Sequence, residues 1–343
     1  MWHTYEMPDG DIELADYPAR VLEKWCNVVW VITPHCNLGC SYCIGFRHRG
    51  TPKSLLQNHS VSAIVKAFEK IRSDSGLSLY ITLTGGEPTI IPEFPELCKR
   101  LTEAGFVIEL QTNLLTNRIV PWLDAVKKEN VAHVVSSYHG WALDNNEKQY
   151  AHYMQNLTEV HNREILVTCK TIVLPDEVPS LPAKIKRLND SVPSDSPVMS
   201  WPFIRGIPKS PEDFAGAYPY SYTTDEKKAI FDSTPYRKNC KWLYMNGAGF
   251  YKGMLCDAGR GFIVLDWKGG AGSCYSLKGE GAPFGNLMAG TIKLNEKPQK
   301  CPVTFCGTSF WGMWYGVDPW NYVPGASQEA ATYCRFGPKT IKD

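Results

Sequence analysis

Apolar runs rich in β-branched residues recur at regular intervals between residues 28 and 203 and predict six strands. The segments between them have a different pattern. In Val61–Ile71 and Phe94–Ala104, for example, apolar residues return every three or four positions, which is typical of amphipathic helices. The six predicted strands are Val28–Thr33, Leu79–Thr84, Val107–Thr112, Val131–Ser137, Ile165–Val173 and Val198–Phe203.

This alternation predicts a parallel sheet with right-handed crossovers, either an open doubly wound sheet or a partial (β/α)6 barrel. In both folds ligands bind at the carboxyl ends of the strands. Past Arg237 the chain is rich in Gly, Cys and aromatic residues, and short alternating runs at Phe262–Asp266 and Thr291–Leu294 predict hairpins. We therefore expect an α/β fold in two parts, a barrel at residues 1–236 and a small hairpin-containing domain at 237–343.

The charges nearly cancel, with 36 Lys and Arg against 35 Asp and Glu in 343 residues, and they form no block of five like charges. This balance argues against a surface dedicated to nucleic acid or to anionic membranes. The N-terminal residues are acidic where a signal peptide is basic, and no apolar run approaches the ~20 residues of a membrane span. We expect a cytoplasmic protein with no membrane partner.

Twelve cysteines in such a protein indicate metal binding or chemistry rather than disulfides. Cys36, Cys40 and Cys43 directly follow the first strand, in the run TPHCNLGCSYC. Three thiolates leave one iron of a [4Fe–4S] cluster open to a further ligand, whereas a structural zinc site needs four protein ligands. A Cys3His zinc site that uses His35 or His48 is the alternative.

The segment Gly85-Gly86-Glu87-Pro88-Thr89 ends the second predicted strand and therefore lies at the same edge of the sheet. Glycines allow close approach to the backbone, and a nearby Glu can accept hydrogen bonds from an ammonium group. The C-x3-C-x2-C loop has an aromatic residue, Tyr42, before its last cysteine. Together with GGEP, this loop resembles the radical S-adenosylmethionine (SAM) superfamily over residues 26–205.

The resemblance implies a partial barrel in which Cys36, Cys40 and Cys43 hold a [4Fe–4S] cluster whose open iron binds SAM. A low-potential donor such as flavodoxin or ferredoxin supplies the electron that cleaves SAM, and the resulting 5′-deoxyadenosyl radical removes hydrogen from an organic substrate. By similarity Asn113, Ser137 and His139 contact the SAM ribose or carboxylate, although such residues are also common as caps and in turns. The remaining implied SAM-binding residues are Tyr42, Gly85, Gly86, Glu87 and Pro88.

A second group of cysteines lies downstream. Cys256 and Cys274 have the spacing C-x12-G-x4-C, which resembles the SPASM and twitch extensions that carry auxiliary clusters, and Cys301 and Cys306 complete a set of four. Two full clusters cannot be built from the available thiols, so we expect one auxiliary [4Fe–4S] cluster of the twitch type, with zinc as the rival metal. The candidate ligands are Cys240, Cys256, Cys274, Cys301, Cys306 and Cys334.

The cysteines left over have two interpretations. Cys240 or Cys334 could return a hydrogen atom to a substrate radical, as in epimerases of similar architecture, or could simply be small buried side chains. Cys26, Cys98 and Cys169 fall on strand or helix patterns, so we expect them in the core.

The length of chain before the first strand bears on the kind of substrate. Few residues precede the first strand, which leaves no room for a leader-peptide-binding domain and favours a small molecule that is oxidised, epimerised or rearranged. Radical modification of a peptide or protein side chain is the alternative. A non-catalytic zinc or iron–sulfur scaffold is the alternative of another class, while an RNA-modifying enzyme is expected to carry a basic domain.

Overall fold

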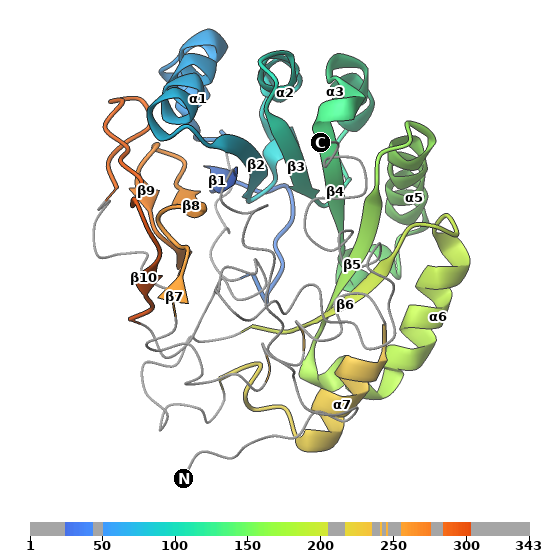
Figure 1. Ribbon diagram of the computed structural model, residues 1–343. Coiled ribbons are helices and arrows are strands. Elements are labelled where there is room, and N and C mark those ends of the chain that lie inside the picture. Colours follow the sequence, from blue (N-terminus) through green and yellow to red (C-terminus); the bar gives the residue numbers. More distant parts are fainter. Residues whose placement is uncertain are drawn as a thin grey trace.

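The computed structural model describes residues 25–43, 51–204, 217–234, 241, 245, 255–275 and 284–302. Within these residues a curved eight-stranded sheet carries helices along its outer side (Figure 1). The strand order is β6-β5-β4-β3-β2-β1-β8-β9, and every neighbouring pair is parallel except β8 and β9. The strands are β1 (Trp25–Thr33), β2 (Ser78–Gly85), β3 (Val107–Thr112), β4 (Val131–Tyr138), β5 (Val167–Val173), β6 (Val198–Pro202), β7 (Leu255–Cys256), β8 (Phe262–Leu265), β9 (Ala271–Gly272) and β10 (Gln299–Lys300).

All six strands predicted from the apolar runs form, and helices connect them as the alternation indicates. Both named helical segments are helical, and α1 continues beyond its predicted end. Helix α1 begins at a serine cap, since the Ser60 hydroxyl accepts a hydrogen bond from the Ala63 N–H. The helices are α1 (Val61–Ser75), α2 (Phe94–Glu103), α3 (Ile119–Ala125), α4 (Gly140–Leu143), α5 (Glu147–Asn162), α6 (Leu181–Ser191) and α7 (Thr224–Asp232).

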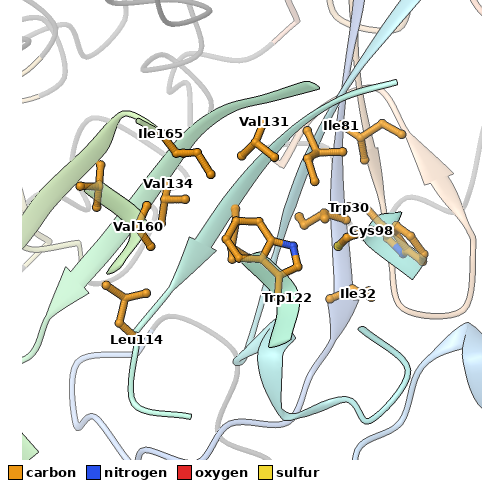
Figure 2. Close-up of a cluster of buried hydrophobic side chains, with 14 of the residues drawn as sticks. Trp30, Ile32, Ile81, Cys98, Leu114, Trp122, Val131, Val134, Val160 and Ile165 are labelled. Carbon is orange, nitrogen blue, oxygen red and sulfur yellow. The ribbon is translucent and has the colours of Figure 1, made fainter. Parts of the chain in front are cut away.

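The two faces of the sheet differ in chemistry. Side chains that point outward, such as Trp30 and Ile81, enter one large apolar cluster with Trp122 of α3 (Figure 2). Because side chains alternate along a strand, the intervening residues face inward. There the register places Thr82 beside Glu109, and Glu109 beside His133. A parallel sheet covered on both faces is usually apolar on both. The polar inner face is therefore available for chemistry rather than needed for the core.

Buried polar groups on the inner face bind one another. Glu109 accepts hydrogen bonds from the Tyr80 hydroxyl at 2.9 Å and from the Gln111 amide at 3.1 Å, and its carboxylate lies 3.7 Å from His133 Nδ1. On its other side His133 Nε2 lies 2.7 Å from Thr168 Oγ1. These contacts compensate for the loss of water around the carboxylate.

Part of the chain after residue 237 continues the barrel sheet. Strand β8 pairs with β1 in parallel, from Asn27 beside Phe262 to Trp30 beside Leu265, and then turns back as the antiparallel strand β9. The hairpin predicted at Phe262–Asp266 therefore forms. The Thr291–Leu294 run contains no strand in the described structure. The predicted domain boundary falls in a part of the chain outside the described residues and stays a prediction.

No helix in the described ranges is both long enough and apolar enough to cross a membrane.

Candidate functional site

The ends of β1 and β2 are joined so closely that only glycine fits. Gly86 N–H donates to the Thr33 carbonyl and Glu87 N–H donates to the His35 carbonyl, each at 2.8 Å. A Cβ atom on Gly85 would lie 2.4 Å from the Thr33 oxygen, and one on Gly86 would lie 2.0 Å from the His35 oxygen. Backbone contact therefore sets the GGEP segment against the start of the loop at residues 34–43, called here the cysteine loop.

This contact predicts that Gly86→Ala is strongly destabilising. The added methyl group overlaps the His35 carbonyl, so the two strand ends must separate, and we expect a loss of about 2–4 kcal/mol in the free energy of unfolding. Urea denaturation measures the loss. Gly272→Ala is the matched control, because nothing lies within 4 Å of a Cβ atom there. Equal stability of the two variants would contradict the proposed role of the glycine pair.

Glu87 links the strand ends from inside the protein. Its side chain is fully buried, and one carboxylate oxygen accepts hydrogen bonds from Thr89 N–H, Thr89 Oγ1 and Thr112 Oγ1 at 2.6–3.1 Å. The other oxygen accepts from Asn113 N–H at 2.7 Å. Burial raises the pKa of Glu87, and these donors counteract the rise. The carboxylate therefore fixes the ends of β2 and β3 relative to each other. Because its oxygens are already occupied, the backbone of the GGEP segment remains to bind a ligand.

The cysteine loop carries Cys36, Cys40 and Cys43 at this edge. Cys36 Sγ accepts a hydrogen bond from Leu38 N–H at 3.4 Å, and the Asn113 amide nitrogen lies 3.9 Å from it. Asn113 also donates to Asn37 Oδ1 at 2.8 Å, so the end of β3 holds the loop. Sequence reasoning missed Asn37, a polar residue between two candidate ligands.

The thiols interact electrostatically without forming a preassembled site. Burial raises the pKa of Cys36 to about 11, and the charges of Cys40 and Cys43 add to the rise. Burial also raises the pKa of Cys40. Within the described residues no three His, Cys, Asp or Glu side chains already converge as a metal site. A metal must therefore draw the thiols together and displace their protons.

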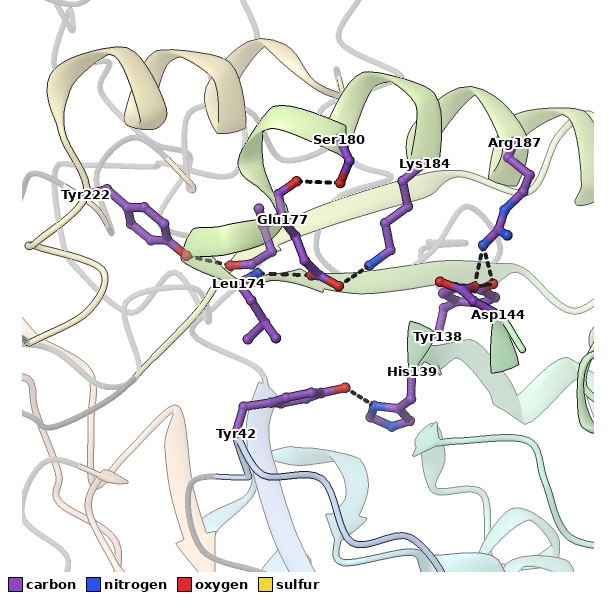
Figure 3. A network of polar contacts seen from close by, with 11 residues as sticks. Tyr42, Tyr138, His139, Asp144, Leu174, Glu177, Ser180, Lys184, Arg187 and Tyr222 are labelled. Atoms are coloured by element: carbon purple, nitrogen blue, oxygen red, sulfur yellow. Dashed lines mark hydrogen bonds and ion pairs between the residues drawn. The ribbon is translucent and has the colours of Figure 1, made fainter. Parts of the chain in front are cut away.

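Aromatic side chains surround Cys40. The Tyr42 hydroxyl lies 2.7 Å from His139 Nδ1 (Figure 3), and Cys40 Sγ lies 3.5 Å from the same nitrogen. The Trp141 indole donates to Cys40 Sγ at 3.4 Å. Burial, followed by the charge of Lys170, lowers the pKa of His139 to about 4, so the ring is neutral at pH 7. Sequence reasoning missed Trp141, although it follows the polar end of β4.

The fold thus brings most of the predicted SAM-binding residues to one edge of the sheet. Ser137 lies near the end of β4, beside Lys170 of β5, and is half-buried. Pro88 is buried and opens a short 3-10 helix at Pro88–Ile90. Of the zinc alternatives, His35 Nδ1 accepts a hydrogen bond from Lys53 N–H at 3.2 Å, and His48 lies outside the described residues.

Three of the downstream cysteines lie in the described part of the chain and are electrostatically coupled. Cys256 in β7, Cys274 after β9 and Cys301 after β10 are all buried. Burial raises the pKa of Cys256 to about 12, and the charges of Cys301 and Cys274 add to the rise. Although the three thiols do not converge as a preformed metal site, Cys301 and Cys274 therefore lie within electrostatic range of Cys256. The antiparallel pairing of β7 with β10 accounts for this, since it sets Cys256 beside Gln299. Cys240, Cys306 and Cys334 lie outside the described residues.

Comparison with known proteins supports a place in the radical SAM superfamily, whose sequence model matches residues 30–180. The chain is 25% identical over 162 residues to 7,8-dihydro-6-hydroxymethylpterin dimethyltransferase of Methanocaldococcus jannaschii, covering 47% of this chain and 30% of that protein. It is 38% identical over 85 residues to 7-carboxy-7-deazaguanine synthase of Haemophilus influenzae, covering 25% and 35%. It is 30% identical over 139 residues to PqqA peptide cyclase of Methylorubrum populi, covering 39% and 33%. These matches span about a third of each relative's length.

Solved structures share the fold at low sequence identity. The structure of anSMEcpe with bound AdoMet and the Kp18Cys peptide has a TM-score of 0.55 at 13% identity, covering 79% of this chain and 81% of that one. SuiB of Streptococcus suis bound to S-adenosylmethionine has a TM-score of 0.50 at 12% identity, covering 81% and 63%. At such identities the likeness establishes the α/β fold alone.

Proposed function

We propose that this chain is a radical SAM enzyme that holds a [4Fe–4S] cluster on Cys36, Cys40 and Cys43 and acts on an organic substrate. One observation carries the proposal. The GGEP segment is hydrogen-bonded, backbone to backbone, to the start of the loop that bears the three thiols. The superfamily match over residues 30–180 includes both motifs.

The residues present fit a cluster better than they fit zinc. Three thiolates on one loop leave an iron open, and sulfur accepts N–H donors from Leu38 and Trp141 of the kind that iron–sulfur sites use. A four-ligand zinc site needs a further donor, and His35 Nδ1 already accepts a backbone N–H. When bound, the cluster and SAM supply a radical that removes hydrogen from the substrate.

The chain's own part is to bind, to orient and to exclude water. We assign Tyr42, Gly85, Gly86 and Pro88 to SAM binding, with Glu87 holding the strand ends beneath them. We assign Asn113, Ser137 and His139 to the SAM ribose or carboxylate. The neutral imidazole of His139 is suited to accept or donate one hydrogen bond without adding charge.

We place the substrate over the inner face of the barrel, whose polar side chains suit a small molecule with several hydrogen-bonding groups. Its oxidation, epimerisation or rearrangement is our first candidate reaction. Modification of a peptide is the second, favoured by the similarity to PqqA peptide cyclase and by the fold shared with peptide-bound anSMEcpe. Turnover of a small-molecule panel against a peptide panel discriminates the two.

An auxiliary [4Fe–4S] cluster on Cys256, Cys274 and Cys301 is a further part of the proposal, with Cys306 as the fourth ligand. The electrostatic coupling of Cys256 to Cys274 and Cys301 supports it. Cys240 or Cys334 remains the proposed hydrogen-atom donor. The electron comes from a low-potential protein such as flavodoxin or ferredoxin, and we propose a cytoplasmic location.

The decisive experiment is the iron and sulfide content of anaerobically purified protein, combined with an assay for 5′-deoxyadenosine after SAM and dithionite are added. We expect about eight irons per chain, four in each cluster, and SAM cleavage that depends on dithionite. Zinc without sulfide or cleavage would overturn the proposal and leave a metal-binding scaffold protein.

A further inference from the structure

Trp141 occupies a position that apolar packing does not explain. Its side chain is 52% exposed, which among the described residues makes it the one large apolar side chain so open to solvent. Tryptophan is usually well buried, and its indole N–H then usually has a hydrogen-bond partner. Here that N–H donates to Cys40 Sγ at 3.4 Å.

The short helix α4 that carries Trp141 is held in place from both sides. At its start the His139 carbonyl accepts hydrogen bonds from the N–H groups of Ala142 and Leu143, and the Leu143 side chain is buried. At its end Asp144 binds both the Tyr138 hydroxyl and the Arg187 guanidinium (Figure 3). The backbone therefore positions the indole over Cys40.

Trp141 differs from the other groups at this sulfur, His139 and the Tyr42 hydroxyl, in being a donor under all conditions. His139 Nδ1 lies 3.5 Å from Cys40 Sγ, but it either donates or accepts depending on the tautomer, and the Tyr42 hydroxyl competes for it at 2.7 Å. An indole nitrogen can only donate. Substitution of Trp141 also leaves the residues of the cysteine loop unchanged. The donor to Cys36, by contrast, is the backbone N–H of Leu38, which belongs to that loop.

We propose that Trp141 is a positioning residue that raises the reduction potential of the cluster held by Cys40, through its hydrogen bond to the ligand sulfur. This inference rests on the proposed function. Reduction adds one negative charge to the cluster and its sulfurs, and an N–H donor stabilises the more negative state. Loss of the donor therefore shifts the reduction equilibrium toward the oxidised cluster. We expect a shift of about threefold to tenfold, roughly 30–60 mV for a one-electron couple.

The test is a redox titration of the reconstituted full-length protein, followed by electron paramagnetic resonance. The relevant signal is the one that SAM alters, because SAM binds only a cluster with an open iron. Trp141→Phe removes the N–H and keeps an aromatic ring, so we expect unchanged iron content and a lower midpoint potential. Trp267→Phe is the matched control. This tryptophan is also partly exposed, and its ring packs against Lys268, so we expect no shift.

Trp141→Ala tests whether the indole ring also acts by shielding the Cys40 sulfur from water. It removes both the N–H and the ring, and water that reaches Cys40 partly replaces the lost donor, so its midpoint should lie between those of the wild type and Trp141→Phe. If Trp141→Phe loads iron poorly, the midpoint potential of Trp141→Ala is compared with that of the wild type instead. A wild-type midpoint in Trp141→Phe, or a shift confined to Trp141→Ala, overturns the inference. Absence of any SAM-sensitive signal in the wild type instead overturns the proposed function.

Discussion

Replacing Cys36, Cys40 and Cys43 together with alanine is expected to abolish reductive SAM cleavage and to remove about four irons per chain, the content of one cluster. All three thiols lie on one loop after β1, so no other described thiol can take their place at this edge. The iron attributed to the auxiliary cluster should remain. Iron analysis and 5′-deoxyadenosine formation measure both effects.

The control for this variant is a cysteine buried in the core. Cys98 of α2 and Cys169 of β5 are fully buried within the large apolar cluster, on a helix and a strand rather than on the cysteine loop. A thiol in such surroundings is typically a structural part of the core. Cys98→Ala and Cys169→Ala should therefore retain the iron content and SAM cleavage of the wild type, apart from some loss of stability. Undiminished cleavage in the triple variant would sink the proposed cluster site.

Replacing Cys256, Cys274 and Cys301 with alanine is expected to halve the iron content and to destabilise the part of the chain around β7 and β10. The proposed auxiliary cluster binds all three, and the free energy of binding at such a site contributes directly to folding. Limited proteolysis compared with iron analysis measures the two effects together. Cleavage of SAM under dithionite should persist, because the cysteine loop is intact.

The outcome separates the auxiliary cluster from its rivals. If the wild type holds zinc and the variant loses it, the thiols do form a metal site, but its metal is zinc rather than iron. Unchanged iron would show that these thiols are only neighbours in the core. Substitution of Cys306, which lies outside the described residues, then tests the proposed fourth ligand by the same iron measurement.

Much of the fold follows from local patterns in the chain. The six apolar runs become β1 to β6 because their β-branched residues suit a strand and their outward-facing side chains enter the apolar core, whereas the helices need an apolar stripe with a period near 3.6. The three cysteines of the first loop were also predictable, since ligands close in sequence and directly after a strand share one place in space. Neither inference depends on distant contacts.

The role of Glu87 could not be predicted from such local patterns. Its place in GGEP indicates a ligand for an ammonium group, but the structure buries its carboxylate among donors from Thr89, Thr112 and Asn113. Two of those donors come from the next strand. Only the parallel register of β2 and β3 brings them within reach.

The sequence by itself determined the alternation of strands and helices and the spacing of the cysteines. Tertiary structure decided that β8 joins the barrel sheet beside β1, that Cys274 and Cys301 come within electrostatic range of Cys256, and that Trp141 faces Cys40. The physical reason is the range of the forces involved. Strand and helix formation is selected by neighbours along the chain, whereas a hydrogen bond between residues 101 positions apart exists only after the strands have taken their order and register.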